Sequence, residues 1–71
     1  MYSLVENGRR LRELRGNIPR QKVAAAIGIS ESALAMYESG ERNPRDEVKI
    51  ALAAYYKKSV GDLFFNAHSS L

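Results

Sequence analysis

The stretch Arg20–Gly40, RQKVAAAIGISESALAMYESG, has the pattern of two short helices joined by a tight turn. Its alanine-rich part, residues 23–27, favours helix and lets another helix approach closely. Gly28 follows at a position where helices commonly end. Ser30 is a residue type that caps helix N-termini, and apolar residues recur with helical spacing after it. We therefore predict one helix that ends before Gly28 and another over Glu31–Ser39.

A break of about three residues that contains a glycine, between two short helices, is typical of the helix-turn-helix motif. In that motif the second helix projects from the first and enters a groove of DNA. The local spacing leaves an ordinary helical hairpin open as an alternative, because short motifs of this kind have low specificity.

Length and composition limit the classes of protein that remain. The chain has 71 residues, 45% of them hydrophobic, with no cysteine and only five Gly and two Pro. A chain of this size without disulfides needs a packed helical core in one domain. No segment approaches 18 apolar residues and residues 1–10 lack a signal-peptide pattern, so we expect a cytoplasmic protein. We assign residues 1–65 to the domain and residues 66–71 to a C-terminal tail.

The basic residues are unevenly distributed along the chain. The formal net charge is +3, from 11 Lys and Arg against 8 Asp and Glu. Residues 1–45 hold eight Lys and Arg against five Glu, whereas residues 46–71 hold three Lys against three acids. The excess therefore lies with the two-helix pattern, which slightly favours a polyanionic partner.

Helical signals also flank the central stretch on its N-terminal side. The periodicity predicts a first helix over Ser3–Arg15, with Leu4, Leu11 and Leu14 on its apolar stripe. Its arginines 9, 10 and 12 are expected on a solvated face. Pro19 suits the first turn of the next helix, where its missing N–H has no consequence.

Two further helices are predicted after the central stretch. Asn43 as the cap and Pro44 as the first helical residue open a helix that runs to about Lys58. Ser59–Asp62 has the capping spacing of a short fifth helix that closes the core with Leu63 and Phe64. The fold class predicted is thus all-α with five helices.

From Leu11 to Phe64 the sequence resembles the Cro and lambda-repressor-like helix-turn-helix proteins, the XRE family, which are mostly transcriptional repressors of bacteria and their phages. The resemblance lies in the segments LRELR (11–15), VAAAIGIS (23–30), Ser32–Gly40 ending in YESG, Asn43-Pro44 and SVGDLF (59–64). It implies a five-helix lambda-repressor-like domain with its helix-turn-helix at the second and third helices.

The resemblance also implies roles for individual residues. The third helix would lie in the major groove and read bases through Glu31, Ser32, Ala33, Ala35 and Met36. Backbone phosphates would be bound by Arg20, Gln21, Arg42, Asn43 and Arg45. Arg15, which closes the first helix, would form a structural ion pair with Glu38. One departure is that Pro19 stands where the family usually has a Ser or Thr cap.

The function that this pattern predicts is sequence-specific binding of double-stranded DNA, most simply by a repressor that occupies a palindromic operator as a homodimer on the bacterial nucleoid. Ile50 and Phe65 exceed what a small core holds and are candidates for the dimer interface. The alternative is a protein-interaction adaptor, antitoxin-like or anti-repressor, with the same fold. His68 has no clustered partner, so we expect no enzyme, metal, cofactor or small-molecule ligand.

Overall fold

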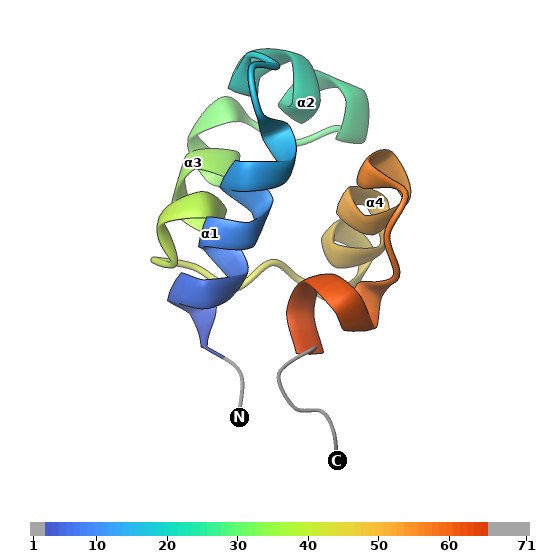
Figure 1. Ribbon diagram of the computed structural model, residues 1–71. Coiled ribbons are helices and arrows are strands. Elements are labelled where there is room, and N and C mark those ends of the chain that lie inside the picture. The colour runs from blue at the N-terminus through green and yellow to red at the C-terminus, as the bar shows by residue number, and fades with distance from the viewer. Residues whose placement is uncertain (1–2, 66–71) are drawn as a thin grey trace.

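The computed structural model describes residues 3–65, and within that range it contains five helices and no strand (Figure 1). The predicted all-α, five-helix fold is confirmed. The helices are α1 (Leu4–Arg15), α2 (Arg20–Ile27), α3 (Glu31–Ser39), α4 (Asp46–Tyr56) and η1 (Gly61–Phe65), the last a short stretch of π-helix. The predicted tail, residues 66–71, and the side chain of Phe65 lie outside the described part.

Side-chain caps fix the starts of α1 and α3. The Ser3 hydroxyl accepts a hydrogen bond from the Glu6 N–H at 3.0 Å, so Ser3 is the cap and the helix begins one residue later than predicted. The Ser30 hydroxyl accepts from the Ala33 N–H at 3.0 Å, as its residue type predicted. Gly40 ends α3 in the left-handed conformation, with φ of 84°.

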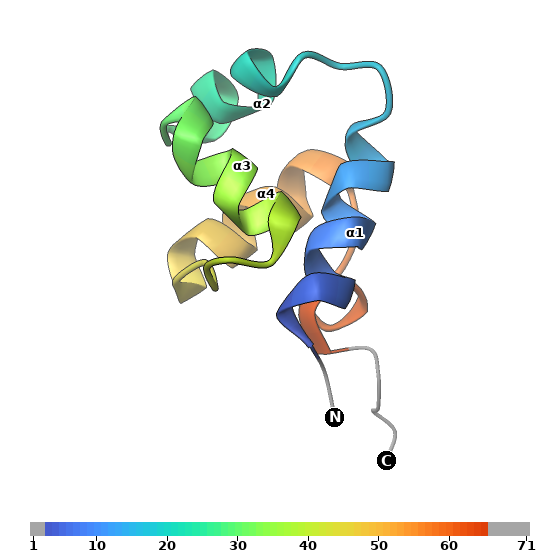
Figure 2. The same cartoon turned by 90° about the vertical axis from the view of Figure 1, so that its left-hand side faces the viewer.

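The core lies between α1 and α3 on one side and α4 and η1 on the other, with α2 across one end (Figures 1 and 2). α1 packs along α3, and the arrangement is possible because Gly8 faces the carbonyl groups of Tyr37 and Glu38 without a side chain between them. The largest fully buried side chains come from all five helices: Phe64, Leu11, Leu34, Leu52, Leu63 and Val23. Burial of these apolar surfaces is the main stabilising term for a domain of this size.

The start of α4 corrects our prediction. Asn43 is not its cap and Pro44 is not its first residue, because residues 43–45 lie outside the helix and Arg45, with an extended backbone, occupies the cap position. Pro44 is buried. The Arg45 carbonyl accepts the first bonds of the helix, from the N–H groups of Val48 and Lys49 at 3.0 Å each. The helix therefore begins two residues later than predicted, with acidic residues in its first turn.

Two other boundaries also differ from the sequence reading. Pro19 is extended, with ψ of 138°, and precedes α2 instead of lying in its first turn. α4 ends at Tyr56 because Lys57 adopts the left-handed conformation, with φ of 59°. Of the helices in the described range, none has the length and apolar character needed to span a membrane.

Candidate nucleic-acid interface

The outward face of α3 is the main candidate surface. Ser32, Ala35, Met36 and Ser39 follow one another at the i, i+3, i+4, i+7 spacing that forms one stripe of a helix. Ser32 and Ser39 are exposed, and Ala35 and Met36 are half-buried. Figure 2 shows α3 in front of α4, at the side of the bundle that lies on the left in Figure 1. The stripe therefore faces outward from the domain.

The five predicted base-reading residues do not share this stripe equally. Glu31 is exposed in the first turn and flanks it. Ala33 is half-buried and packs against the core cluster, so it lies at the inner edge of the helix. Ser39 belongs to the stripe but was not among the predicted base-reading residues. Its position seven residues after Ser32 already placed it on the same face of the helix. Its hydroxyl donates to the Met36 carbonyl at 3.1 Å.

A hydrogen-bonded turn sets the angle between α2 and α3. The Ile29 N–H donates to the Ala24 carbonyl at 3.0 Å and the Gly28 N–H donates to the Ala25 carbonyl at 3.4 Å, which is the Schellman arrangement. Gly28 has φ of 79°, a conformation in which other residues are strained. Ile29 then packs against the core cluster. The turn is therefore fixed by both backbone bonds and apolar contact.

An ion-pair cluster joins the end of α1, the start of α2 and the end of α3. Arg15 forms a two-pronged contact with Glu38, from Nε to Oε2 at 2.7 Å and from Nη2 to Oε1 at 3.0 Å. Both side chains are buried, and hydrogen bonding to Glu38 raises the pKa of the Arg15 guanidinium. Arg20, the first residue of α2, donates from Nε to Oε1 of Glu38 at 3.2 Å. The family resemblance implied the pairing of Glu38 with Arg15, whereas the contact of Glu38 with Arg20 was not predicted.

Tyr56 of α4 lies beside this cluster. Its hydroxyl is buried and has no hydrogen-bond partner within residues 3–65. Burial, together with the negative charge of Glu38, raises the pKa of Tyr56 to about 12. Its ring contacts that of Tyr55 edge to face, with centroids 5.2 Å apart. Both tyrosines are half-buried and pack against the core.

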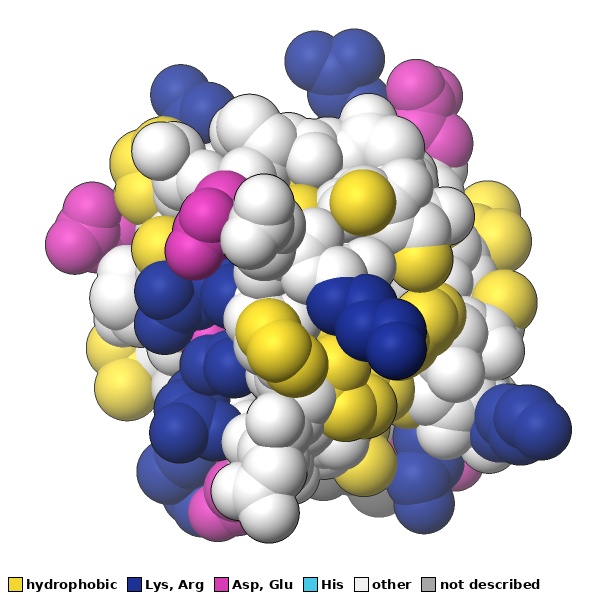
Figure 3. Space-filling view, turned by 90° about the horizontal axis from the view of Figure 1, so that it is seen from above, with side chains coloured by type: hydrophobic (Ala, Val, Ile, Leu, Met, Phe, Trp, Pro, Cys, Tyr) yellow, Lys and Arg dark blue, Asp and Glu magenta, His cyan; other side chains and the backbone are white. Residues whose placement is uncertain are grey.

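The predicted phosphate-binding residues fall into two groups. Gln21, Arg42, Asn43 and Arg45 are exposed, and Arg45 Nη1 is 3.9 Å from Glu47 Oε2. Arg20 is only 35% exposed because of its contact with Glu38. In the view onto the α2 end of the bundle, several Lys and Arg side chains lie together at the lower left, the side on which α1 and α3 lie, and others are spread over the top, centre and right (Figure 3). Acidic side chains are interspersed among them.

The arginines of α1 do not all lie on the solvated face that was predicted for them. Arg9 is exposed between Glu6 and Glu13, at 2.6 and 3.1 Å from their carboxylate oxygens, as a solvated face requires. Arg10 does not belong to that face, because its Nη1 donates to the Leu63 carbonyl at 2.9 Å and so joins α1 to η1. The periodicity of α1 alone could not reveal this contact.

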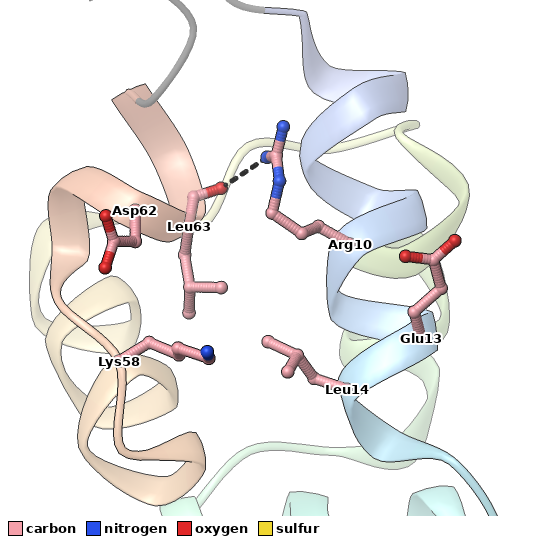
Figure 4. A pocket seen from close by; sticks show the side chains of 6 residues that line it. All are labelled: Arg10, Glu13, Leu14, Lys58, Asp62 and Leu63. Atoms are coloured by element: carbon pink, nitrogen blue, oxygen red, sulfur yellow. Dashed lines mark hydrogen bonds between the residues drawn. The ribbon is translucent and has the colours of Figure 1, made fainter.

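A partly open pocket of about 260 Å³ lies between α1 and the chain around η1 (Figure 4). This volume is below the range of roughly 300–1,000 Å³ typical of ligand sites. Its wall combines two leucines with side chains of both charges: Arg10, Glu13, Leu14, Lys58, Asp62 and Leu63. Residues 3–65 contain no group of His, Cys, Asp and Glu side chains suited to a metal ion.

Two large apolar side chains are exposed in the described range. Ile50 on α4 is 60% exposed, and Val5 on α1 is 65% exposed. Ile50 was singled out by the sequence, whereas Val5 was not. Phe65, the other predicted interface residue, ends η1, and its side chain lies outside the described part.

The fold and this surface define a class of protein. An outward-facing α3 is held against α2 by the Gly28 turn at one end and by the Arg20–Glu38 contact at the other, which is a helix-turn-helix domain. A family model described as helix-turn-helix matches residues 9–63. The chain therefore belongs to the helix-turn-helix family of the XRE, lambda-repressor-like type, whose members are DNA-binding transcription regulators.

Two solved structures are similar to this chain. The restriction-modification controller protein C.AhdI from Aeromonas hydrophila shares 32% identity, with a TM-score of 0.78 over 86% of this chain and 96% of that one. The P22 c2 repressor protein, solved in complex with synthetic operator 9T in the presence of Tl+, shares 26% identity, with a TM-score of 0.80 over 83% of this chain and 92% of that one. A search of curated proteins gives no match.

Proposed function

We propose that this chain represses transcription by binding a palindromic DNA operator as a homodimer, in the cytoplasm and on the nucleoid. The observation that carries the proposal is the outward stripe of α3, which no other described helix covers. A helix of this diameter fits the major groove of B-form DNA. The controller protein and the operator-bound repressor, both matched over most of their length, support the same reading.

In the proposed complex, Ser32 at the start of the stripe and Met36 within it contact base edges. Ser32 hydrogen-bonds to a base, while Ala35 and Met36 give apolar contact with thymine methyl groups. Glu31 accepts from a cytosine amino group at the start of the helix, and Ala33 has a smaller role because it packs against the core.

Phosphates flank this surface in the proposal. Arg42 and Asn43, in the loop after α3, and Gln21 at the start of α2 are exposed and bind the DNA backbone, together with Arg20 and Arg45. Arg and amide donors fix the register of a protein on DNA in this way without reading its sequence. The homodimer places two such domains on successive half-sites, about one helical turn apart, through Ile50 and Phe65.

The second candidate function is a protein-interaction adaptor. It is favoured by two features of this surface: Ala35 and Met36 in the stripe are apolar, and Glu31, which flanks the stripe, would repel phosphate. Salt dependence separates the two functions, because DNA binding releases counterions and an apolar contact does not.

Fluorescence anisotropy with a labelled random-sequence duplex at several salt concentrations tests the proposal. We expect the logarithm of the affinity to fall linearly with the logarithm of salt concentration, with a slope of about 0.9 per phosphate contacted. Arg42→Ala should lower both the affinity and the slope. Binding that is absent, or that is independent of salt and of Arg42, would favour the adaptor.

A further inference from the structure

Glu38 has a contact that its pairing with Arg15 does not explain. Arg15 uses Nε and Nη2 on the carboxylate and donates its Nη1 to the Ile18 carbonyl at 2.9 Å, so each of its nitrogens has a partner. Arg20 also reaches the same carboxylate, from Nε to Oε1. The buried carboxylate is thus shared by two guanidinium groups, and the three side chains together keep one net positive charge.

The two arginines differ in how many of their side-chain nitrogens form hydrogen bonds within the described part of the chain. Arg20 uses Nε alone on Glu38, and within residues 3–65 neither of its terminal nitrogens, Nη1 and Nη2, has a hydrogen-bond partner. The Arg20 side chain is 35% exposed, against 8% for Arg15. The net positive charge of the cluster is therefore presented to solvent at the start of α2, through the two terminal nitrogens of a guanidinium that is held at Nε.

We propose that Glu38 is a positioning residue for DNA binding, which holds Arg20 by its Nε so that Nη1 and Nη2 are directed at one backbone phosphate. This inference rests on the DNA-binding function proposed above. A planar guanidinium suits the role because its five donors are fixed relative to one another. Anchoring one edge of it removes much of the rotamer freedom that a free surface arginine loses on binding.

Arg20→Lys tests this geometry because it keeps the charge and removes the fork. An ammonium group is a single point, so a lysine held on Glu38 has no second nitrogen to direct at a phosphate. We expect both Arg20→Lys and Arg20→Ala to weaken binding to random-sequence duplex roughly tenfold at moderate salt. Both should also lower the salt slope by about 0.9.

Lys22→Ala is the matched control, since Lys22 is an exposed cation two residues along α2 that has no contact with Glu38. Its effect should be clearly smaller than that of Arg20→Lys. Glu38→Gln supplies a second measurement, with thermal unfolding recorded first to establish that the variant is folded. In that background Arg20→Ala should weaken DNA binding much less than in the wild type, because the arginine has already lost its anchor.

The outcomes separate this inference from the proposed function. If the wild type shows salt-dependent binding but Arg20→Lys matches it in affinity and in salt slope, a positive charge is enough at this position and the positioning role of Glu38 is wrong. The same conclusion follows if Lys22→Ala weakens binding as much as Arg20→Lys. If the wild type shows no salt-dependent binding, both proposals fail. If Glu38→Gln does not fold, the comparison of Arg20→Lys, Arg20→Ala and Lys22→Ala still decides between these results.

Discussion

Gly8 of α1 lies directly against the carbonyl oxygen of Glu38 in α3, so closely that a Cβ atom on Gly8 would overlap that oxygen. The same Cβ would be 2.6 Å from the Tyr37 carbonyl oxygen, also a backbone atom. Backbone atoms cannot move aside as the end of a flexible side chain can. Gly8 therefore sets how close α1 and α3 approach, and with it the distance over which Arg15 reaches Glu38.

Gly8→Ala should destabilise the domain. Alanine favours helix over glycine, but the added methyl group must push α1 from α3, and overpacking of this kind lowers the free energy of unfolding by about 1–3 kcal/mol. Urea unfolding followed by circular dichroism measures the change. Gly61→Ala is the matched control, because a Cβ there would meet nothing closer than the Ser59 hydroxyl at 3.8 Å. Equal stability of the two variants would contradict the close contact of α1 and α3.

Breaking the buried ion pair should have a larger effect. Arg15→Met leaves Glu38 buried with only Arg20 to balance its charge, and loss of one partner of a buried pair commonly costs about 3–5 kcal/mol. For a domain of marginal stability this is a large share of the total free energy of unfolding, so we expect a strongly lowered midpoint of urea unfolding. Arg9→Ala is the control: it removes two contacts of an exposed arginine and should leave the midpoint of urea unfolding unchanged. A folded Arg15→Met variant of normal stability would show that the pair contributes little.

Stability should fall at high pH because of Tyr56. Burial raises its pKa in the folded protein to about 12, whereas the unfolded chain has the ordinary value of 10.0. The stabilisation from the neutral phenol is thus complete below pH 10 and is lost as pH rises through about 12. Tyr56→Phe should remove this part of the pH dependence at no cost to stability near neutral pH, since the hydroxyl has no partner in residues 3–65. Unfolding midpoints across this pH range, with Tyr55→Phe as the control, test it; an unchanged profile in Tyr56→Phe would refute the assignment.

The sequence predicts those helix ends that are fixed by neighbouring residues, and it does not predict those that are fixed by burial or by an unusual backbone conformation. The bounds of α3 and the end of α2 follow from local chemistry, because Ser30 caps one helix and Gly28 and Gly40 take left-handed conformations. The start of α4 could not be found in this way, since Arg45 occupies the cap position without a side-chain bond and Pro44 is held by burial. Lys57 likewise ends α4 in a conformation for which a lysine gives no signal.

The candidate site likewise has features that local sequence predicts and features that depend on contacts between helices. Helical spacing predicts which residues of α3 face outward, and it would also have identified Ser39. It does not reveal that Ala33 packs against the core, or that Arg20 and Arg10 are held by groups 18 and 53 residues away. Those contacts depend on how the helices cross, which a residue pattern along one chain does not contain.

Substitutions in the stripe of α3 should change which sequences are bound. Ser32→Ala and Met36→Ala should alter preference at one or two positions of the site, by about 1–3 kcal/mol per base pair, while affinity for random DNA stays the same. Arg42→Ala should instead weaken binding to every sequence. The measurement is a competition binding assay, in which DNA duplexes that each differ from a selected site by one base pair compete for each protein variant. If Arg42→Ala changes base preference and Ser32→Ala does not, the two roles have been assigned the wrong way round.

Ile50→Lys should reduce self-association. Ile50 is 60% exposed on α4, and a lysine there keeps the helix while it removes apolar contact area and places like charges opposite each other across a two-fold axis. Sedimentation equilibrium should show a dimer for the wild type and a monomer for the variant. Val5→Lys, at an equally exposed apolar residue on α1, is the control and should remain dimeric. A wild type that is monomeric at tens of micromolar, and that binds DNA as a single copy, would exclude the homodimer.

Selection of bound sites from a pool of random duplex DNA, carried out in parallel with the wild type and with Ser32→Ala, tests whether α3 reads a DNA sequence. We predict that the wild type enriches a two-fold symmetric site whose half-sites are one helical turn apart, and that Ser32→Ala enriches a site changed at the same position in each half. Failure of the wild type to enrich any sequence, or enrichment of the same site by both proteins, would contradict the role that we assign to this helix.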